Sequence, residues 1–114
     1  MSYLCRVKLS FCMKRAETIK KISAAMQSLL PQMQVWLYGS QARGDAREDS
    51  DIDLLVLLDK PRITLSDRIT IHAALADIET ADNVQINPYV QTLEAWNKHD
   101  NLFRTNVLND RIAI

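Results

Sequence analysis

Two aspartates with the spacing to share a cation open an apolar segment, DIDLLVLLD, in which they are Asp51 and Asp53. Side chains two apart on a β-strand project from the same face, so these two carboxylates would lie next to each other. They repel one another unless a cation lies between them, and Mg²⁺ prefers carboxylate and phosphate oxygens. The pair therefore predicts a magnesium site that serves phosphoryl or nucleotidyl transfer, although a D-x-D pair alone also fits a solvated strand end.

A glycine–serine turn precedes this pair, where the apolar run QVWLY ends at Gly39 and Ser40. A short helix that starts here would direct backbone N–H groups and the positive end of its dipole outward. Glycine allows a phosphate to approach closely, and the serine hydroxyl can donate to a phosphate oxygen. Gly39 and Ser40 are therefore candidate phosphate-binding residues, with a plain helix cap as the alternative.

The two halves together form the pattern GSx₁₀DxD, and each half stands at the end of a predicted strand. In this pattern the sequence resembles the minimal nucleotidyltransferases of the DNA polymerase beta superfamily. The resemblance covers residues 14–110, and its most specific part is YGSQARGDAREDSDIDLLV. The matching positions are Ser40, Arg43, Gly44, Ser50, Asp51 and Asp53.

The resemblance implies a role for the polar residues of this segment. Asp51 and Asp53 would be the catalytic residues and would hold Mg²⁺, whereas the nucleotide would be bound by Gly39, Ser40, Arg43 and Ser50. Arg43 suits a triphosphate because its guanidinium group is planar, always charged and able to form two parallel hydrogen bonds. An ion pair of Arg43 with Asp45 or Glu48 is the alternative.

The resemblance also implies an activity, which is Mg²⁺-dependent transfer of a nucleoside monophosphate, AMP from ATP, to a hydroxyl of a partner protein. Relatives of this kind act with a HEPN-domain helical toxin, for which the nucleotidyltransferase is the antitoxin. Active relatives carry a third carboxylate on a later strand, but here NVQINPYV places Gln85 and Asn87 on the outward side. The alternative function is therefore a catalytically weak nucleotide-binding antitoxin, or a regulatory subunit, that acts by binding a helical partner.

The apolar spacing predicts the elements that position these residues. Helices are predicted over residues 14–30, 40–44 and 66–80, with one or two more between residues 92 and 110. Strands are predicted over residues 34–39, 51–59 and 83–91, and the final RIAI either adds a strand or trails. This order predicts an α/β class, which the resemblance specifies as the nucleotidyltransferase fold, with a small mixed β-sheet and helices mainly on one face.

Three finer expectations concern caps and faces. Ser66 is predicted to cap the third helix, and its inward residues are predicted to be Ile69, Ala73, Leu75, Ala76 and Ile78. Pro88 favours a short strand or an edge position, because proline cannot donate a hydrogen bond to a neighbouring strand. Trp96 is assigned to the core, with an apolar patch presented to another chain as the alternative.

The length of 114 residues fits one domain, so residues 14–114 are assigned to a single minimal nucleotidyltransferase domain. Residues 1–13 are assigned to an N-terminal extension, with an edge strand as the alternative. A formal net charge of zero argues against direct binding to nucleic acid, and no apolar stretch is long enough for a membrane span. Cys5 and Cys12 lack metal-ligand spacing and are expected to be reduced thiols in the cytoplasm. The oligomeric state stays open, with a homo-oligomer as one option.

Overall fold

The computed structural model describes residues 13–29, 32–47 and 49–114. In chain order its elements are α2 (Met13–Leu29), β1 (Met33–Tyr38), α3 (Ser40–Arg43), β2 (Ile52–Leu58), α4 (Leu65–Asp82), β3 (Ile86–Thr92), α5 (Leu93–Lys98), α6 (Leu102–Asp110) and β4 (Ile112–Ala113). The predicted order of helices and strands is confirmed, and the C-terminal residues form two helices and a short last strand. The expectation of an extension or edge strand at the N-terminus falls on residues 1–12, which lie outside the described residues.

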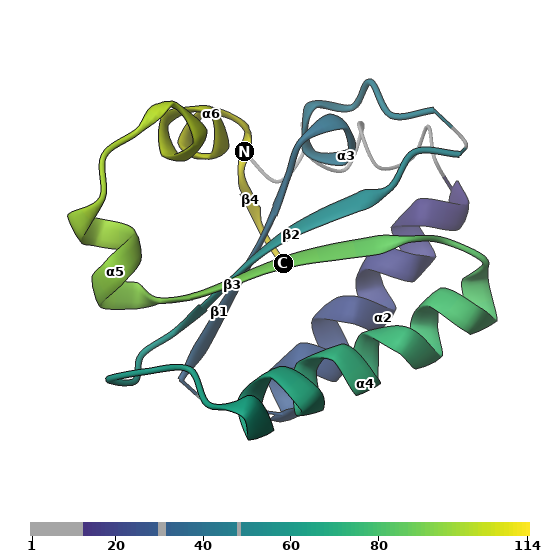
Figure 1. Cartoon of the computed structure of the whole chain (residues 1–114). Coiled ribbons are helices and arrows are strands. Elements are labelled where there is room, and N and C mark those ends of the chain that lie inside the picture. The colour runs from purple at the N-terminus through teal and green to yellow at the C-terminus, as the bar shows by residue number, and fades with distance from the viewer. Residues whose placement is uncertain (1–12, 30–31, 48) are drawn as a thin grey trace.

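The strands form one mixed sheet in the order β3-β2-β1-β4 (Figure 1). Strand β2 pairs antiparallel with β1 and parallel with β3, and β4 pairs antiparallel with β1. Strand β3 is therefore at the edge of the sheet, as Pro88 predicted. One side of an edge strand has no neighbouring strand, so a residue without a backbone N–H is tolerated there. The parallel pairing of β2 with β3 brings the starts of both strands to the same end of the sheet.

The centre of the sheet is the apolar part of β2, where Leu54, Leu55, Val56, Leu57 and Leu58 are all buried. Because side chains alternate along a strand, this run contributes to packing on both faces of the sheet. Each such side chain stabilises the fold by about 1.5–3 kcal/mol relative to an exposed position. The aspartates at the start of this run are therefore attached to the most buried of the described strands.

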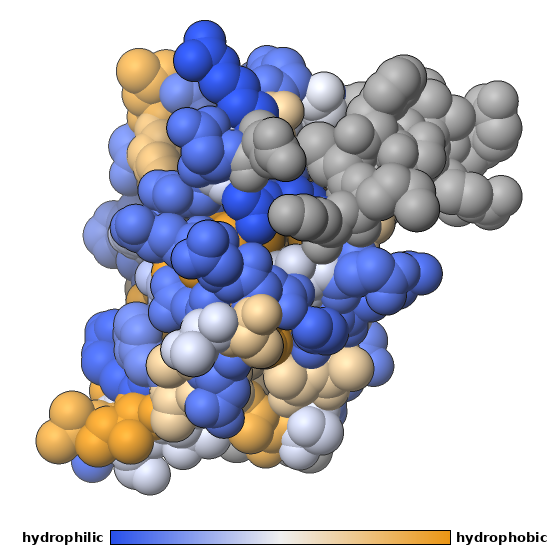
Figure 2. Space-filling view, turned by 90° about the vertical axis from the view of Figure 1, so that its right-hand side faces the viewer, coloured by the Kyte–Doolittle hydropathy of each residue, from blue (hydrophilic) through white to orange (hydrophobic). Residues whose placement is uncertain are grey.

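The two long helices, α2 and α4, lie side by side across one face of the sheet (Figure 1). The other face is covered in part by the short helices, since Trp96 of α5 and Val107 of α6 pack on Leu55 and Leu57. The predicted arrangement, with helices mainly on one face, is thus confirmed, as is the core position of Trp96. Figure 2 shows the face that lies on the right in Figure 1, and the described residues on it are mainly hydrophilic, with hydrophobic residues scattered among them. In the described part of the chain, no helix combines the length and apolar character that crossing a membrane requires.

Helix α4 corrects two expectations. Its N-cap is Thr64, whose side chain accepts a hydrogen bond from the backbone of Asp67 while the Asp67 carboxylate accepts from the Thr64 backbone. The prediction of Ser66 as the cap was wrong, because this reciprocal capping box needs an acidic residue three positions after the cap. The buried face follows from this start and consists of Asp67, Ile71, Leu75 and Ile78. The expected inward residues Ile69, Ala73 and Ala76 are exposed.

Candidate active site

Gly39 and Asp53 meet at the end of β1. The antiparallel register places Tyr38 opposite Asp53, so the turn that follows Tyr38 passes close to the Asp53 carboxylate. A Cβ atom on Gly39 would lie only 2.6 Å from Oδ2 of Asp53. The backbone of Gly39 has φ 76° and ψ −154°, a conformation that is essentially restricted to glycine. Residue 39 must therefore be glycine both for its backbone and for the space that the carboxylate occupies.

The short helix α3 begins directly after Gly39, with Ser40 as its first residue. Its turn is closed by hydrogen bonds from Arg43 N to Gly39 O and from Gly44 N to Ser40 O, both 3.0 Å long. Gly44 ends the helix in the left-handed conformation, with φ 84°, which is a common role of glycine. The start of this helix, where backbone N–H groups lack acceptors within the helix, thus stands beside Asp53.

Asp51 and Asp53 lie at the start of β2, and one amide group joins them. Asn87 Nδ2 lies 3.2 Å from Oδ2 of Asp51 and 3.3 Å from Oδ1 of Asp53. Asn87 comes from the neighbouring strand β3, where it is the register partner of Asp53. The predicted pairing of the two carboxylates on one face is thereby observed, and Ile52 between them is buried in the core.

These residues suit a single hard cation. An oxygen atom from each carboxylate converges on one hydrogen-bond donor, which shows that one positively polarised group can contact both. Carboxylate oxygens are the protein ligands that Mg²⁺ prefers, and Mg²⁺ usually completes its shell with water and substrate phosphates. Across the described ranges, no group of three or more His, Cys, Asp or Glu residues is placed to hold a metal ion. Among the described residues, Asp51 and Asp53 are thus two carboxylates that a cation at this position could contact together with water and substrate.

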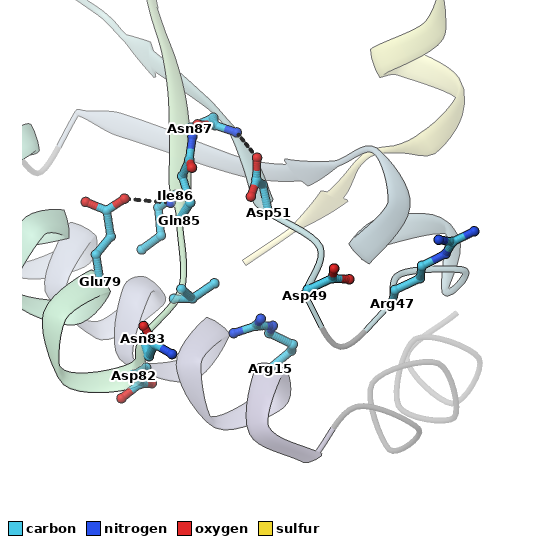
Figure 3. Close-up of a pocket in the computed structure, with 11 residues that line it drawn as sticks. Arg15, Arg47, Asp49, Asp51, Glu79, Asp82, Asn83, Gln85, Ile86 and Asn87 are labelled. Carbon is cyan, nitrogen blue, oxygen red and sulfur yellow. Dashed lines mark hydrogen bonds between the residues drawn. The ribbon is translucent and has the colours of Figure 1, made fainter.

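A cavity of about 1160 Å³ opens beside Asp51 and Asn87, at the edge of the sheet formed by β3 (Figure 3). All of its lining residues except Val84 and Ile86 are polar or charged. Its charged residues are Arg15, Arg47, Asp49, Asp51, Glu79 and Asp82, so acidic groups outnumber basic ones. An anionic nucleotide would enter such a cavity favourably only together with a cation that offsets this charge.

The family model of Polymerase beta, Nucleotidyltransferase matches residues 17–114, which include the glycine–serine turn and both aspartates. The chain belongs to this nucleotidyltransferase family. A solved structure of a minimal nucleotidyltransferase is 28% identical and covers 86% of this chain and 94% of its own, with a TM-score of 0.59. The predicted membership in the DNA polymerase beta superfamily and the predicted fold are thus confirmed.

Other relatives of this nucleotidyltransferase are more distant or match a shorter segment. Probable protein adenylyltransferase MntA from Haemophilus influenzae is 32% identical over 47 residues, which are 41% of this chain and 41% of that protein. This match therefore spans less than half the length of the curated relative. A toxin–antitoxin crystal structure with AMP-PNP shares the fold, with a TM-score of 0.60 at 17% identity, over 82% of this chain and 69% of its own. A nucleotidyltransferase from Sulfolobus solfataricus has a TM-score of 0.51 at 18% identity, over 93% and 80% of the two chains.

Arg43 of this nucleotidyltransferase is held by two carboxylates. Its Nε donates to Asp45 at 3.1 Å and its NH1 group donates to Asp110 at 2.9 Å. The hydrogen bond to Asp45 raises the pKa of Arg43 most, and the hydrogen bond to Asp110 raises it further. The ion pair with Asp45, an alternative that the sequence left open, is therefore present. Asp110 was missed because it lies on α6, far from Arg43 in sequence, and no local signal indicated their contact.

Ser50 also has a structural role, in the turn that directly precedes Asp51. Its hydroxyl accepts a hydrogen bond from the backbone N of Arg47 at 2.7 Å, and its own backbone N donates to Arg47 O at 3.1 Å. Gln41 Nε2 reaches the Ser50 carbonyl at 3.5 Å and so links α3 to this turn. Ser50 thus fixes the turn immediately before Asp51, and its hydroxyl is engaged there.

Tyr38 was not among the residues singled out from the sequence, although it immediately precedes the glycine–serine turn. Burial raises the pKa of the Tyr38 phenol, and the nearby Asp53 carboxylate raises it further. The ring of Phe103, from α6, packs edge-on against Tyr38 and also contacts Tyr89 of β3. The rings of Tyr38, Tyr89 and Phe103 therefore form an aromatic cluster that borders the carboxylates on the side of α5 and α6.

Proposed function

We propose that this nucleotidyltransferase transfers AMP from ATP to a hydroxyl group of a partner protein. The observation that carries the proposal is the convergence of Asp51 and Asp53 with the Gly39–Ser40 turn at one end of the sheet. Family membership and the relative named as a protein adenylyltransferase support both the type of reaction and a protein as the acceptor.

In this proposal Asp51 and Asp53 are the catalytic carboxylates and hold Mg²⁺. When bound, Mg²⁺ offsets the charge on the phosphate oxygens during transfer. Gly39 leaves room for the phosphates beside Asp53, and the first turn of α3, with Ser40, donates hydrogen bonds to them. Arg43 reaches the triphosphate after exchanging its contact with Asp110 for a phosphate.

The transfer itself is a displacement at the α-phosphorus of ATP. The acceptor oxygen forms a bond to that phosphorus, the bond to the bridging oxygen breaks, and pyrophosphate leaves with the electron pair. The proton of the acceptor hydroxyl passes to solvent water. The role of this chain's residues is to hold the triphosphate and the acceptor in line, since positioning and electrostatics supply most of the catalysis in such reactions.

We further propose that the acceptor is a small helical HEPN-domain protein, which acts as a toxin that this chain neutralises. Support comes from the fold shared with a toxin–antitoxin structure that holds a nucleotide analogue, and from the segment shared with the MntA protein. The described domain has a sheet, two long helices and three short ones.

Labelled ATP tests this function. The purified chain, Mg²⁺ and a HEPN-domain protein from the same genome are incubated with ATP labelled at either the α- or the γ-phosphorus. Label from the α-position should appear on the partner, and label from the γ-position should not. The variant with Asp51→Asn and Asp53→Asn should transfer nothing, whereas a matched variant with Asp59→Asn and Asp77→Asn, both exposed, should retain activity. Absence of label on the partner with the wild-type chain, under conditions in which nucleotide binds, would contradict an enzymatic role.

A second candidate is an antitoxin that acts by binding its partner and turns over poorly. The observation that favours it is Asn87, an amide, at the place where a third carboxylate was expected. Toxin neutralisation in cells separates the two functions. Neutralisation that survives the Asp51→Asn and Asp53→Asn double change supports binding alone, and neutralisation that is lost with it supports transfer.

A further inference from the structure

Asn87 occupies a distinctive place in the sheet. It is the residue directly opposite Asp53 in the parallel pairing of β2 and β3, so its side chain projects from the same face as both aspartates. Its single amide nitrogen lies within hydrogen-bond distance of one oxygen of Asp51 and one of Asp53. Figure 3 shows the amide turned toward Asp51 at the border of the cavity.

The side chain of Gln85 fixes the orientation of this amide. Gln85, two residues earlier on the same face of the chain, donates from Nε2 to Oδ1 of Asn87 at 3.1 Å. The opposite orientation would place Oδ1 of Asn87 against two carboxylate oxygens and its nitrogen against the Gln85 donor, both of which are repulsive. Asn87 therefore presents a donor to the aspartates and has no negative charge to offer a cation.

The acidic residues that precede this strand, at the end of α4, have other partners. Glu79 Oε2 accepts the backbone N–H of Ile86 at 2.8 Å and so ties the end of α4 to the start of β3. Asp82 accepts from Thr18 Oγ1 and from Lys21 Nζ, both at 2.6 Å. Recruiting either carboxylate as a metal ligand would break contacts that hold the two long helices and β3 in place.

We propose that Asn87 is a positioning residue that holds Asp51 and Asp53 together and limits their site to a single divalent cation. Its amide reduces the repulsion between the two carboxylates when no cation is bound, by donating to both. A second cation would need a further anionic ligand beside Asp53, and the residue at that register position is neutral. The proposal rests on the proposed function, because it assumes that Asp51 and Asp53 are the cation ligands.

Counting bound Mn²⁺ tests this role without using activity. Mn²⁺ replaces Mg²⁺ as the probe, the non-cleavable analogue α,β-methylene-ATP supplies the phosphates, and electron paramagnetic resonance reports free and bound metal. About one Mn²⁺ per chain is expected for the wild type, and about two for Asn87→Asp, in which a third carboxylate completes a two-metal site. Gln91→Glu is the matched control, because it adds the same charge to β3 four residues further along, opposite Leu57, and should leave the count at the wild-type value.

Each outcome bears on the proposal. An unchanged count in both Asn87→Asp and the longer Asn87→Glu, each shown to be folded by its circular dichroism, would overturn it. A wild-type chain that binds about two ions would also overturn it and would leave the proposed transfer reaction intact. A rise in Gln91→Glu equal to that in Asn87→Asp would show a general charge effect and would contradict a specific role for residue 87. Loss of α-label transfer in the wild type, with the Mn²⁺ counts as expected, would instead contradict only the proposed function.

Discussion

A Cβ atom placed on Gly39 would lie 2.6 Å from Oδ2 of Asp53, far inside van der Waals contact. Gly39→Ala should therefore displace the carboxylate and also strain a backbone with positive φ. We expect AMP transfer to fall by about 100-fold, the order of loss that follows a misplacement of about 1 Å. Initial rates with α-labelled ATP measure this effect.

Gly44→Ala is the control for backbone strain alone, since Gly44 also has positive φ. It should lower the free energy of unfolding by about 1–2 kcal/mol and leave the transfer rate within a few-fold of the wild type. Equal losses of rate in the two variants would show that strain, and not the contact with Asp53, makes glycine necessary at position 39.

The pairing of Arg43 with Asp110 predicts that loss of the Asp110 carboxylate strengthens nucleotide binding. If Arg43 must leave Asp110 to contact the triphosphate, Asp110→Asn should tighten the binding of Mg²⁺–ATP. We expect a gain of up to about fivefold, because exposed ion pairs contribute about 0.2–1 kcal/mol. Isothermal titration calorimetry measures the affinity, and Asp100→Asn, which removes an exposed carboxylate at the other end of α6, is the control. Weaker binding in Asp110→Asn would contradict the proposed exchange.

The cap of α4 can be tested with two similar residues. Thr64→Ala removes the side chain that accepts from Asp67 N and should lower the free energy of unfolding by about 1 kcal/mol. Ser66→Ala, two residues further on, should change it by less than about 0.5 kcal/mol, because Ser66 is exposed and is not the cap. Urea denaturation followed by circular dichroism measures both, and a larger loss from Ser66→Ala would contradict the capping assignment.

Asp67 should make stability depend on pH. The hydrogen bonds from Lys60, followed by the one from the Thr64 backbone, lower the pKa of Asp67 in the folded protein. The folded pKa of Asp67 lies below its unfolded pKa. The ionised carboxylate therefore contributes its full share of the unfolding free energy above the unfolded pKa, and this share is lost as pH falls through the folded pKa. The difference in unfolding free energy between wild type and Asp67→Asn should therefore be large at neutral pH and shrink below about pH 4. Urea denaturation at several pH values measures it, and a difference that grows on acidification would contradict this account.

The sequence predicted the contact between the glycine–serine turn and the aspartates because both lie at ends of consecutive strands. Pairing those strands brings Gly39 and Asp53 together with no information from elsewhere in the chain. The outward position of Asn87 followed in the same way from the alternation of β3, since a period of two fixes which residues share a face.

Residues that depend on tertiary packing could not be predicted in this way. The contact of Arg43 with Asp110 joins α3 to α6, and their approach is set by how α6 packs on the sheet. In α4, Ile69 was expected to be buried because it is apolar, yet the helix phase set by Thr64 and Asp67 leaves it exposed. Apolar character gave the correct type of element there, and the cap decided which face turned inward.

The central claim is that Asp51 and Asp53 hold a cation that meets the phosphates of a nucleotide bound at Gly39 and Ser40. A crystal structure with Mg²⁺ and α,β-methylene-ATP tests it most directly. We expect both carboxylates to ligate Mg²⁺, and the phosphates to lie against the Gly39–Ser40 turn. A nucleotide bound elsewhere on the molecule, or a Mg²⁺ ion that contacts neither aspartate, would contradict the claim.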